Sequence, residues 1–238
     1  MRDVQPSEGP VVFLPGMNCS SRMWEPVIAR LEAQGVTREL RSESLTGSSI
    51  EDCVDGLLER LPDRFAPAGL SLGGIVAMAM VRTAPWRVSR LCLMATNPCA
   101  PTPGQLRSWQ ALRERLTAGA SSRQLQEELL PALLAPDTRD ALEAMVLDMA
   151  DEVGDADLAS QLMMQSTRVD ERAALAKVSV PTMIVAGGRD ALCPVATHRE
   201  MESLVPGSRL TVLPERGHLL TLEDPQGVVA GVESWLRT

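Results

Sequence analysis

A serine between two glycines, directly after an apolar run, is the feature of this chain that most restricts its fold. The stretch reads Gly69-Leu70-Ser71-Leu72-Gly73 and has the pattern G-x-S-x-G. The glycines allow the backbone to turn sharply from a strand into a helix, which holds the serine hydroxyl out at the end of the strand. The N–H groups at the start of the helix favour negative charge at the same place. Because an ordinary strand-turn-helix has the same pattern, a base and an acid must be found before it predicts chemistry.

Short apolar runs alternate with segments of helical periodicity on both sides of a long helical block. A continuous apolar run is typical of a strand that is buried on both faces of a parallel sheet. Strands are therefore expected at residues 11–14, 36–42, 88–95, 182–186 and 209–213, and immediately before Ser71. Helices are expected around residues 24–31 and at 49–61, 72–83, 195–204 and 225–235. The alternation predicts an α/β fold with a doubly wound, mainly parallel sheet.

The segment 97–177 differs from its flanks because its apolar residues recur at helical spacing and no strand pattern appears. Capping candidates or Pro and Gly breaks precede each stretch of this kind. Four helices are expected, at residues 104–118, 121–134, 138–153 and 155–168. We therefore predict a core of residues 1–96 and 178–238, with residues 97–177 inserted as an all-helical cap.

Composition and charge narrow the possible functions. The chain has 238 residues, 45% of them hydrophobic, which suits one globular core with an insertion. A formal net charge of −8 without a cluster of Lys or Arg argues against nucleic acid or an anionic membrane as a partner. The five cysteines form no C-x-x-C pair and only two histidines are present, so no metal site and no cofactor are predicted.

The same residues bear on where the protein acts. An odd number of scattered cysteines is typical of reduced thiols, which favours a cytoplasmic protein. Residues 1–10 lack the apolar stretch of a secretory signal, and no run is long enough to span a membrane. Lys177 is the only lysine and tyrosine is absent, a bias that points to a GC-rich bacterial gene. The oligomeric state, monomer or homodimer, stays open.

An acid and a base both follow later strands of the predicted sheet. Asp190 comes after a Gly-Gly turn that ends the strand 182–186, and His218 comes after the strand 209–213. The carboxyl ends of parallel strands share one edge, so both residues are expected beside Ser71. A serine hydroxyl becomes a strong nucleophile when an imidazole takes its proton, and a carboxylate holds that imidazole in the right tautomer. The order Ser71, Asp190, His218 is the one that accompanies this type of serine turn.

Other residues could serve as acid or base. Asp224 fits a solvated face ahead of the last helix, and the acidic residues near positions 151 and 155 lie in the predicted cap. The second histidine, His198, lies in the polar helical stretch Ala196-Thr197-His198-Arg199-Glu200, so we expect a solvated side chain there.

Four motifs occur in order along the chain: Leu14-Pro15-Gly16-Met17, Gly69-Leu70-Ser71-Leu72-Gly73-Gly74, Gly188-Arg189-Asp190 and Gly217-His218. Together they resemble the α/β-hydrolase superfamily over nearly the whole chain. The chain is most similar to small bacterial serine hydrolases with a helical cap, among them carboxylesterases, enol-lactonases and pimeloyl-carrier-protein methyl esterases. Two departures, Pro15 in place of a frequent histidine and the absence of early antiparallel strands, touch no catalytic atom.

The resemblance implies a role for each motif residue. Ser71 would be the nucleophile, His218 the general base and acid, and Asp190 the carboxylate that orients the histidine. The backbone N–H groups of Met17 and Leu72 would form the oxyanion hole.

The predicted function is hydrolysis of a small carboxylic ester or lactone through an acyl-enzyme, with a small acyl molecule as the substrate. We expect substrate contacts from Asn18, Asn97, Met163 and Leu192. Cys19 and Cys193 flank the expected catalytic loops and are expected to pack there. Thioesterase, amidase, cofactor-free perhydrolase or haloperoxidase and C–C hydrolase activity remain alternatives, as does a protein of this fold that only binds a small molecule.

Overall fold

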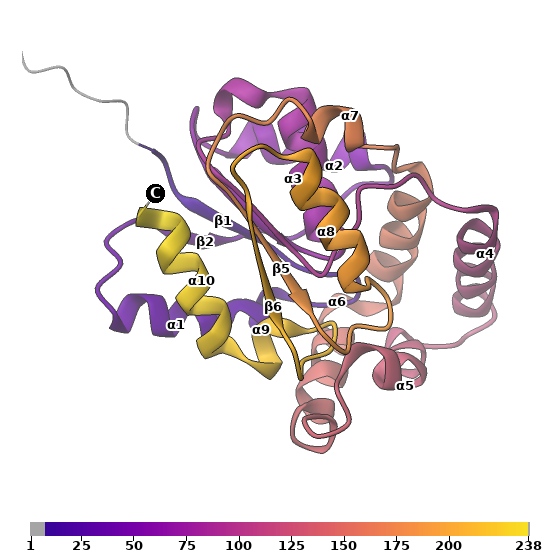
Figure 1. Ribbon diagram of the computed structural model, residues 1–238. Coiled ribbons are helices and arrows are strands. Elements are labelled where there is room, and N and C mark those ends of the chain that lie inside the picture. The colour runs from indigo at the N-terminus through magenta and orange to yellow at the C-terminus, as the bar shows by residue number, and fades with distance from the viewer. Residues whose placement is uncertain (1–7, 238) are drawn as a thin grey trace, which may run out of the picture.

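The fold is built on one parallel sheet, which Figure 1 shows in a computed structural model that describes residues 8–237. Within these residues the sheet has six strands in the order β2-β1-β3-β4-β5-β6. The strands are β1 (Val11–Leu14), β2 (Leu40–Ser42), β3 (Ala66–Leu70), β4 (Leu91–Met94), β5 (Thr182–Gly187) and β6 (Arg209–Leu213). The predicted doubly wound parallel sheet is confirmed. The prediction about a secretory signal concerns residues 1–10, of which 1–7 lie outside the described residues.

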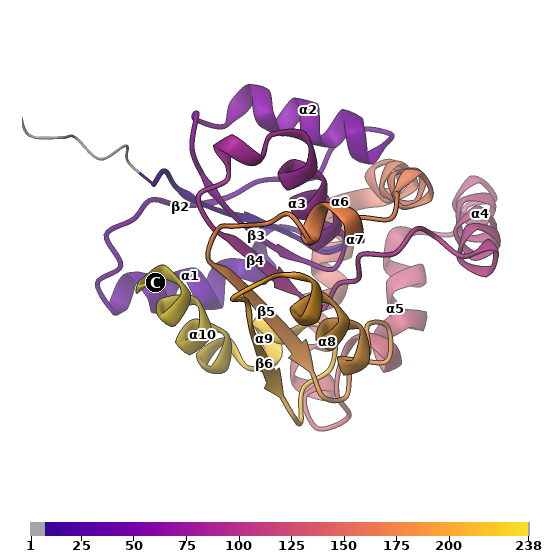
Figure 2. The same ribbon diagram turned by 45° about the horizontal axis from the view of Figure 1, so that its top comes forward.

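Helices cover both faces of the sheet, which explains why its inner strands are buried along their whole length. Successive side chains of a strand point to opposite faces, so Val11 and Phe13 pack into one apolar cluster and Val12 and Leu14 into the other. Helices α1 (Glu25–Ala33) and α10 (Pro225–Arg237) belong to the first layer, and α2 (Ile50–Arg60), α3 (Leu72–Thr83) and α8 (Val195–Leu204) to the second. Figure 2 shows the two layers on either side of the strands.

The strand order reverses beside β1, and this reversal fixes the place of the site. The chain runs from β1 to β2 on one side and then returns to β3 on the other side of β1. Ligands of open α/β sheets bind at the carboxyl ends of the strands that border such a reversal. Leu14 at the end of β1 pairs with Gly69 of β3, so the loops that follow these two strands begin side by side.

Only helices lie between β4 and β5. They are α4 (Pro103–Thr117), α5 (Ser122–Leu133), α6 (Arg139–Thr167) and the short α7 (Arg172–Leu175). Gly154, with φ 76° and ψ 168°, breaks α6 into two helical parts, as the two predicted helices at 138–153 and 155–168 require. Figure 1 shows α4, α5 and α6 together on one side of the molecule, whereas α7 packs against α3 and α8. The domain boundaries at 97 and 177 stay a prediction.

The structure adds elements of one turn that the sequence pattern did not predict. These are η1 (Ser21–Trp24), η2 (Pro85–Arg87), α7 and α9 (Leu220–Glu223). A single turn has too few residues to show a helical period. Within residues 8–237, none of the helices combines the length and apolar character needed to cross a bilayer.

Candidate active site

Ser71 occupies a strained turn between β3 and α3. Its backbone has φ 54° and ψ −113°, a combination that residues with a side chain rarely adopt. Two hydrogen bonds hold the turn: Ser71 N donates to Met94 O at 2.9 Å, and Thr96 Oγ1 donates to Ser71 O at 2.8 Å. The neighbouring strand β4 therefore fixes a conformation that costs on the order of 1–3 kcal/mol.

Two glycines allow α3 to begin against the sheet. A Cβ on Gly69 would lie 2.2 Å from Gly73 O, and a Cβ on Gly73 would lie 2.1 Å from Leu14 O. Both distances are far below van der Waals contact, so only glycine fits at either position without backbone movement. The G-x-S-x-G pattern thus brings the first turn of α3 onto the end of β1, beside the loop that contains Met17.

Asp190 and His218 form a buried pair at the carboxyl ends of β5 and β6. His218 Nδ1 lies 2.8 Å from Asp190 Oδ2, and the two residues are 3% and 6% exposed. The other carboxylate oxygen, Oδ1, accepts hydrogen bonds from the backbone N–H groups of Leu192 and Cys193 at 2.8 and 2.9 Å. One oxygen of Asp190 therefore fixes its own loop while the second orients the imidazole.

The electrostatic surroundings keep Asp190 ionised. Burial raises the pKa of this carboxyl, but the nearby His218 and the hydrogen bonds from His218, Cys193 and Leu192 outweigh it and hold the pKa below its usual range. An ionised carboxylate next to Nδ1 favours the tautomer that carries its proton there. Nε2 is then free to accept a proton.

A cavity of about 250 Å³ brings the turn and the histidine together. Ser71 and His218 both line it, although no direct hydrogen bond joins Ser71 Oγ to the ring in the described part of the chain. Such contacts are often long in structures without substrate and tighten when substrate binds. Its further lining residues include Gly16, Met17, Cys19, Ile75, Thr96, Asn97, Gln105, Trp109, Leu112, Gln126, Leu129, Leu133, Gln165, Arg168, Leu192, Cys193 and Leu219.

Two backbone N–H groups lie next to this serine without an acceptor. Across residues 8–237, no carbonyl or side chain accepts a hydrogen bond from Met17 N or Leu72 N. Leu72 is the first residue of α3, so the positive end of the helix dipole adds to its N–H. The next residue, Asn18, fixes the backbone beside Met17. It has φ 56° and donates its N–H to Gln161 Oε1 at 2.7 Å.

The helical segment between β4 and β5 also holds the loop that contains His218. His218 N and Leu219 N both donate to Leu133 O at the end of α5, at 3.0 and 3.1 Å. The buried carboxylate of Glu223 accepts hydrogen bonds from Gly217 N and from Ala135 N, each at 3.0 Å. These bonds tie the loop after β6 to the segment between α5 and α6.

The predicted substrate contacts divide into two groups. Asn97 and Leu192 line the cavity, whereas Asn18 and Met163 do not. The Asn18 side chain is 2% exposed and donates to Ser122 O and Gln126 Oε1, so it connects the loop after β1 to α5. Met163 lies two residues before Gln165, which turns it by about 200° around α6 and away from the cavity-lining face.

The expectation of a solvated His198 is wrong. The residue is 0% exposed, its Nε2 accepts a hydrogen bond from Thr96 N at 3.2 Å, and its Nδ1 lies 3.1 Å from Pro194 O. The ring therefore carries its proton on Nδ1. Burial lowers the pKa of His198, although the Pro194 carbonyl acts in the opposite direction. Because Thr96 also bonds to Ser71 O, this histidine supports the serine turn from behind.

The cavity-lining residues that sequence reasoning missed include Trp109, Gln126, Gln165 and Arg168. A signal for Gln165 is present in the helical spacing. Leu158, Leu162 and Gln165 are buried along one stripe of α6, and a glutamine within an apolar stripe indicates a polar function. Trp109 is the one buried residue of α4, and its other residues are partly or fully exposed.

Cysteines also line the cavity, as the sequence allowed. Cys19 and Cys193 are buried, and burial raises the pKa of each thiol to about 12. Asp190, Cys193 and His218 have ligand atoms within 4.8 Å of one another, a spacing that a metal ion could use. A thiol with so high a pKa is a poor ligand in its resting state, and both oxygens of Asp190 already accept hydrogen bonds.

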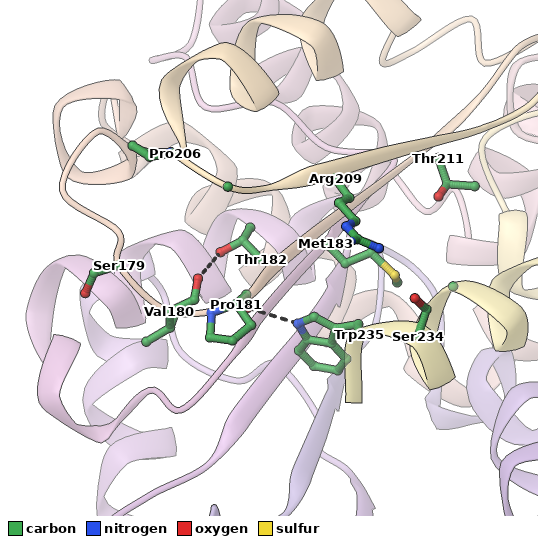
Figure 3. A pocket seen from close by; sticks show the side chains of 12 residues that line it. Ser179, Val180, Pro181, Thr182, Met183, Pro206, Arg209, Thr211, Ser234 and Trp235 are labelled. Atoms are coloured by element: carbon green, nitrogen blue, oxygen red, sulfur yellow. Dashed lines mark hydrogen bonds between the residues drawn. The ribbon is translucent and has the colours of Figure 1, made fainter. Parts of the chain in front are cut away.

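A second cavity, of about 350 Å³, lies near the amino ends of β5 and β6 (Figure 3). Its lining comes from the beginnings of β5 and β6 and from α10, and includes Pro181, Met183, Arg209 and Trp235. Trp235 Nε1 donates to Pro181 O at 3.0 Å at one side. Carboxylate, thiol, and imidazole groups are all missing from its described lining, so it offers no acid–base pair.

Comparison with known proteins places this architecture in a family. A family model described as the alpha/beta hydrolase family matches residues 11–231. A pimeloyl-[acyl-carrier protein] methyl ester esterase of Aromatoleum aromaticum is 29% identical, over 95% of this chain and 98% of the relative. A bifunctional biotin-biosynthesis protein of Teredinibacter turnerae is 25% identical over 98% of this chain, which spans only 45% of that protein. A thermophilic esterase from Thermogutta terrifontis, solved with malate bound, has the same fold, with a TM-score of 0.82, 23% identity, and coverage of 96% of this chain and 89% of that one.

Proposed function

This chain belongs to the alpha/beta hydrolase family, and we propose that it is a serine esterase that cleaves a small carboxylic ester or lactone through an acyl-enzyme. The observation that carries the proposal is the His218–Asp190 pair, whose imidazole faces the cavity that Ser71 also lines. The similarity to a methyl ester esterase supports an ester as the substrate. The cavity volume of about 250 Å³ equals the share of about eight water molecules in the liquid, which favours a small substrate.

In the proposed acylation step, Ser71 Oγ attacks the acyl carbon while His218 Nε2 takes the hydroxyl proton. The substrate carbonyl oxygen gains negative charge and accepts hydrogen bonds from Met17 N and Leu72 N. The intermediate collapses when the bond to the alcohol oxygen breaks, and the imidazolium gives its proton to that oxygen. In a lactone, this oxygen stays tethered to the acyl group.

Deacylation repeats the same steps with water as the nucleophile. His218 takes a proton from water, the hydroxide attacks the acyl carbon, and the proton returns to Ser71 Oγ as the acid leaves. Asp190 accepts the Nδ1 proton in a hydrogen bond throughout and stabilises the imidazolium form. The preformed hydrogen bonds to Oδ1 spare the carboxylate any reorganisation during the cycle.

We also propose that residues 97–177 act as a cap that selects the substrate. Part of the cavity wall comes from this segment, through Trp109 of α4, Gln126 of α5 and Gln165 of α6. Loops and insertions at this edge decide which chemistry an α/β fold performs. The same catalytic residues can therefore serve thioesters, amides, peracids or C–C bonds, and these activities are the alternatives to the ester.

The test is the loss of the nucleophile. Ser71→Ala should lower hydrolysis of p-nitrophenyl acetate and butyrate by more than a thousandfold, since removal of a catalytic serine costs on the order of 10⁶ in turnover in a related triad. The far-UV spectrum and melting temperature should stay close to those of the wild type. Ser160→Ala is the matched control, because its hydroxyl donates only within α6, to Ala156 O.

A fluorophosphonate probe separates an enzyme from a protein that only binds a ligand. The probe should label the wild type and Ser160→Ala at neutral pH and leave Ser71→Ala unlabelled. Full ester hydrolysis by Ser71→Ala, or no labelling of the wild type, would refute the proposed function.

A further inference from the structure

One wall of the active-site cavity contains a buried arginine. Arg168 follows the end of α6 and is 5% exposed. Its guanidinium lies over the Trp109 ring at 5.1 Å, Nη1 donates to Gln165 Oε1 at 3.2 Å, and Nη2 donates to Gln105 Oε1 at 3.0 Å. All these partners are neutral, so they orient the charge without compensating it.

This arginine has no anionic partner in the described chain. None of the ion pairs within residues 8–237 includes Arg168, and no aspartate or glutamate lines the cavity in that range. Its Nε is buried without an acceptor. Burial lowers the pKa of this guanidinium, as expected for a buried positive charge without a counter-ion. A buried charge without a counter-ion destabilises a protein strongly, so its retention in a cavity points to an anion that arrives with the ligand.

A second donor in the same wall lacks an acceptor. Gln126 is 1% exposed, and its Nε2 makes no hydrogen bond while its Oε1 accepts from Asn18. Gln126 and Arg168 both line the cavity. The described wall therefore offers one permanent positive charge and spare N–H donors, which complement a group with several acceptor oxygens.

We propose that this wall is an anion subsite, in which Arg168 binds a carboxylate that the substrate carries in addition to its reactive ester or lactone bond. The proposal rests on the proposed function and narrows it to esters and lactones of carboxylate-bearing acids. A guanidinium matches the planar carboxylate in two parallel hydrogen bonds, and one positive charge balances one negative charge. A phosphate dianion would keep an excess charge in this small cavity.

The experiment compares two esters that differ only in charge. Monomethyl glutarate ends in a carboxylate, and the methyl ester of glutaramic acid ends in an amide of the same size. The wild type should hydrolyse the carboxylate ester with at least a tenfold higher kcat/KM, as expected for a charge-assisted pair. The succinate and adipate homologues then show which chain length spans the cavity.

Arg168→Gln should reduce the ratio of the two kcat/KM values to near one, and Arg168→Lys should keep part of it. Arg107→Gln is the matched control, because this exposed arginine of α4 is absent from the cavity wall, and it should keep the wild-type ratio. Equal kcat/KM values for both esters in the wild type would refute the subsite, and so would a preference that Arg168→Gln leaves intact.

A binding measurement keeps the subsite testable without turnover. Calorimetry on Ser71→Ala should give a dissociation constant for monomethyl glutarate at least tenfold lower than for the amide ester. Methyl phosphonate, the phosphorus counterpart of acetate, should compete less well than acetate against the carboxylate ester. Equal affinities for the two esters would refute the subsite alone, whereas failure to cleave any ester would refute only the proposed function.

Discussion

Replacing Gly73 with alanine tests how closely α3 must approach the end of β1. The added Cβ would lie 2.1 Å from Leu14 O and 2.7 Å from Pro15 O, both of them backbone atoms that cannot rotate away. An ordinary carbon–oxygen contact is about 3.3 Å, so the helix and the loop must separate by roughly 1.2 Å. The change falls between the two proposed oxyanion donors, Met17 N and Leu72 N.

Two magnitudes follow from this displacement. Overpacking of this kind costs about 1–3 kcal/mol, which a domain with a stability of about 5–15 kcal/mol survives. A misplacement of about 1 Å lowers turnover by on the order of a hundredfold. Gly73→Ala should therefore fold, unfold at a lower urea concentration, and hydrolyse p-nitrophenyl acetate about a hundredfold more slowly.

Gly56→Ala provides the matched control. Its Cβ would meet only the flexible Arg60 Nη1, at 3.4 Å, in the middle of α2. Alanine there should stabilise the protein by about 0.5–1 kcal/mol and leave activity at the wild-type level. The reasoning fails if Gly73→Ala has wild-type turnover, or if the two substitutions shift the urea midpoint in the same direction.

Two further predictions concern the buried acid and the second histidine. Asp190→Asn should lower kcat for ester hydrolysis by on the order of 10⁴, because the amide favours the wrong tautomer of His218. Asp224→Asn is the control, since its Oδ1 can still accept from Gly227 N, and it should stay near the wild-type kcat. Similar losses in both variants would contradict the proposed role of Asp190. Burial depresses the pKa of His198 in the folded protein. As pH falls below about 6.5, His198 therefore binds a proton in the unfolded chain before it does so in the folded protein, and the folded protein loses stability. Urea unfolding at pH 7.5 and 5.5 should show a loss of up to about 1.4 kcal/mol per pH unit that His198→Gln lacks, and parallel pH profiles would exclude this histidine as the cause.

The sheet could be predicted because most of its strands are short apolar runs, and the inner ones are buried on both faces. β1, β5 and β6 occur almost at the predicted residues, and the resemblance to the α/β-hydrolase superfamily is confirmed by the family match over residues 11–231. Parallel topology then brings the ends of β3, β5 and β6 to one edge. This reasoning placed Ser71, Asp190 and His218 together, and their catalytic roles stay predictions.

The cavity wall could not be predicted in the same way, because it depends on which face each helix between β4 and β5 turns toward the cavity. Met163 and Gln165 are two residues apart, yet only Gln165 lines the cavity. His198 was misjudged because α8 is polar around most of its surface and buries only His198 and Met201. Their spacing of three residues is a weak signal, since a helix of this length allows several such pairs. The buried His198 ring accepts a hydrogen bond from the backbone N–H of Thr96, and no sequence pattern predicts this contact.

The order of the strands also bears on how the protein is made during translation. β2, β1, β3 and β4 are contiguous in the sheet and precede the whole helical insertion, so they can pair while the ribosome is still adding the later residues. The free edge of β4 must then wait for β5, and an unpaired edge is prone to pair with other chains. Ser71 emerges early, whereas Asp190 and His218, its proposed acid and base, follow β5 and β6. A nascent chain therefore has the proposed nucleophile without its partners, and a vulnerable sheet edge, until its second half arrives.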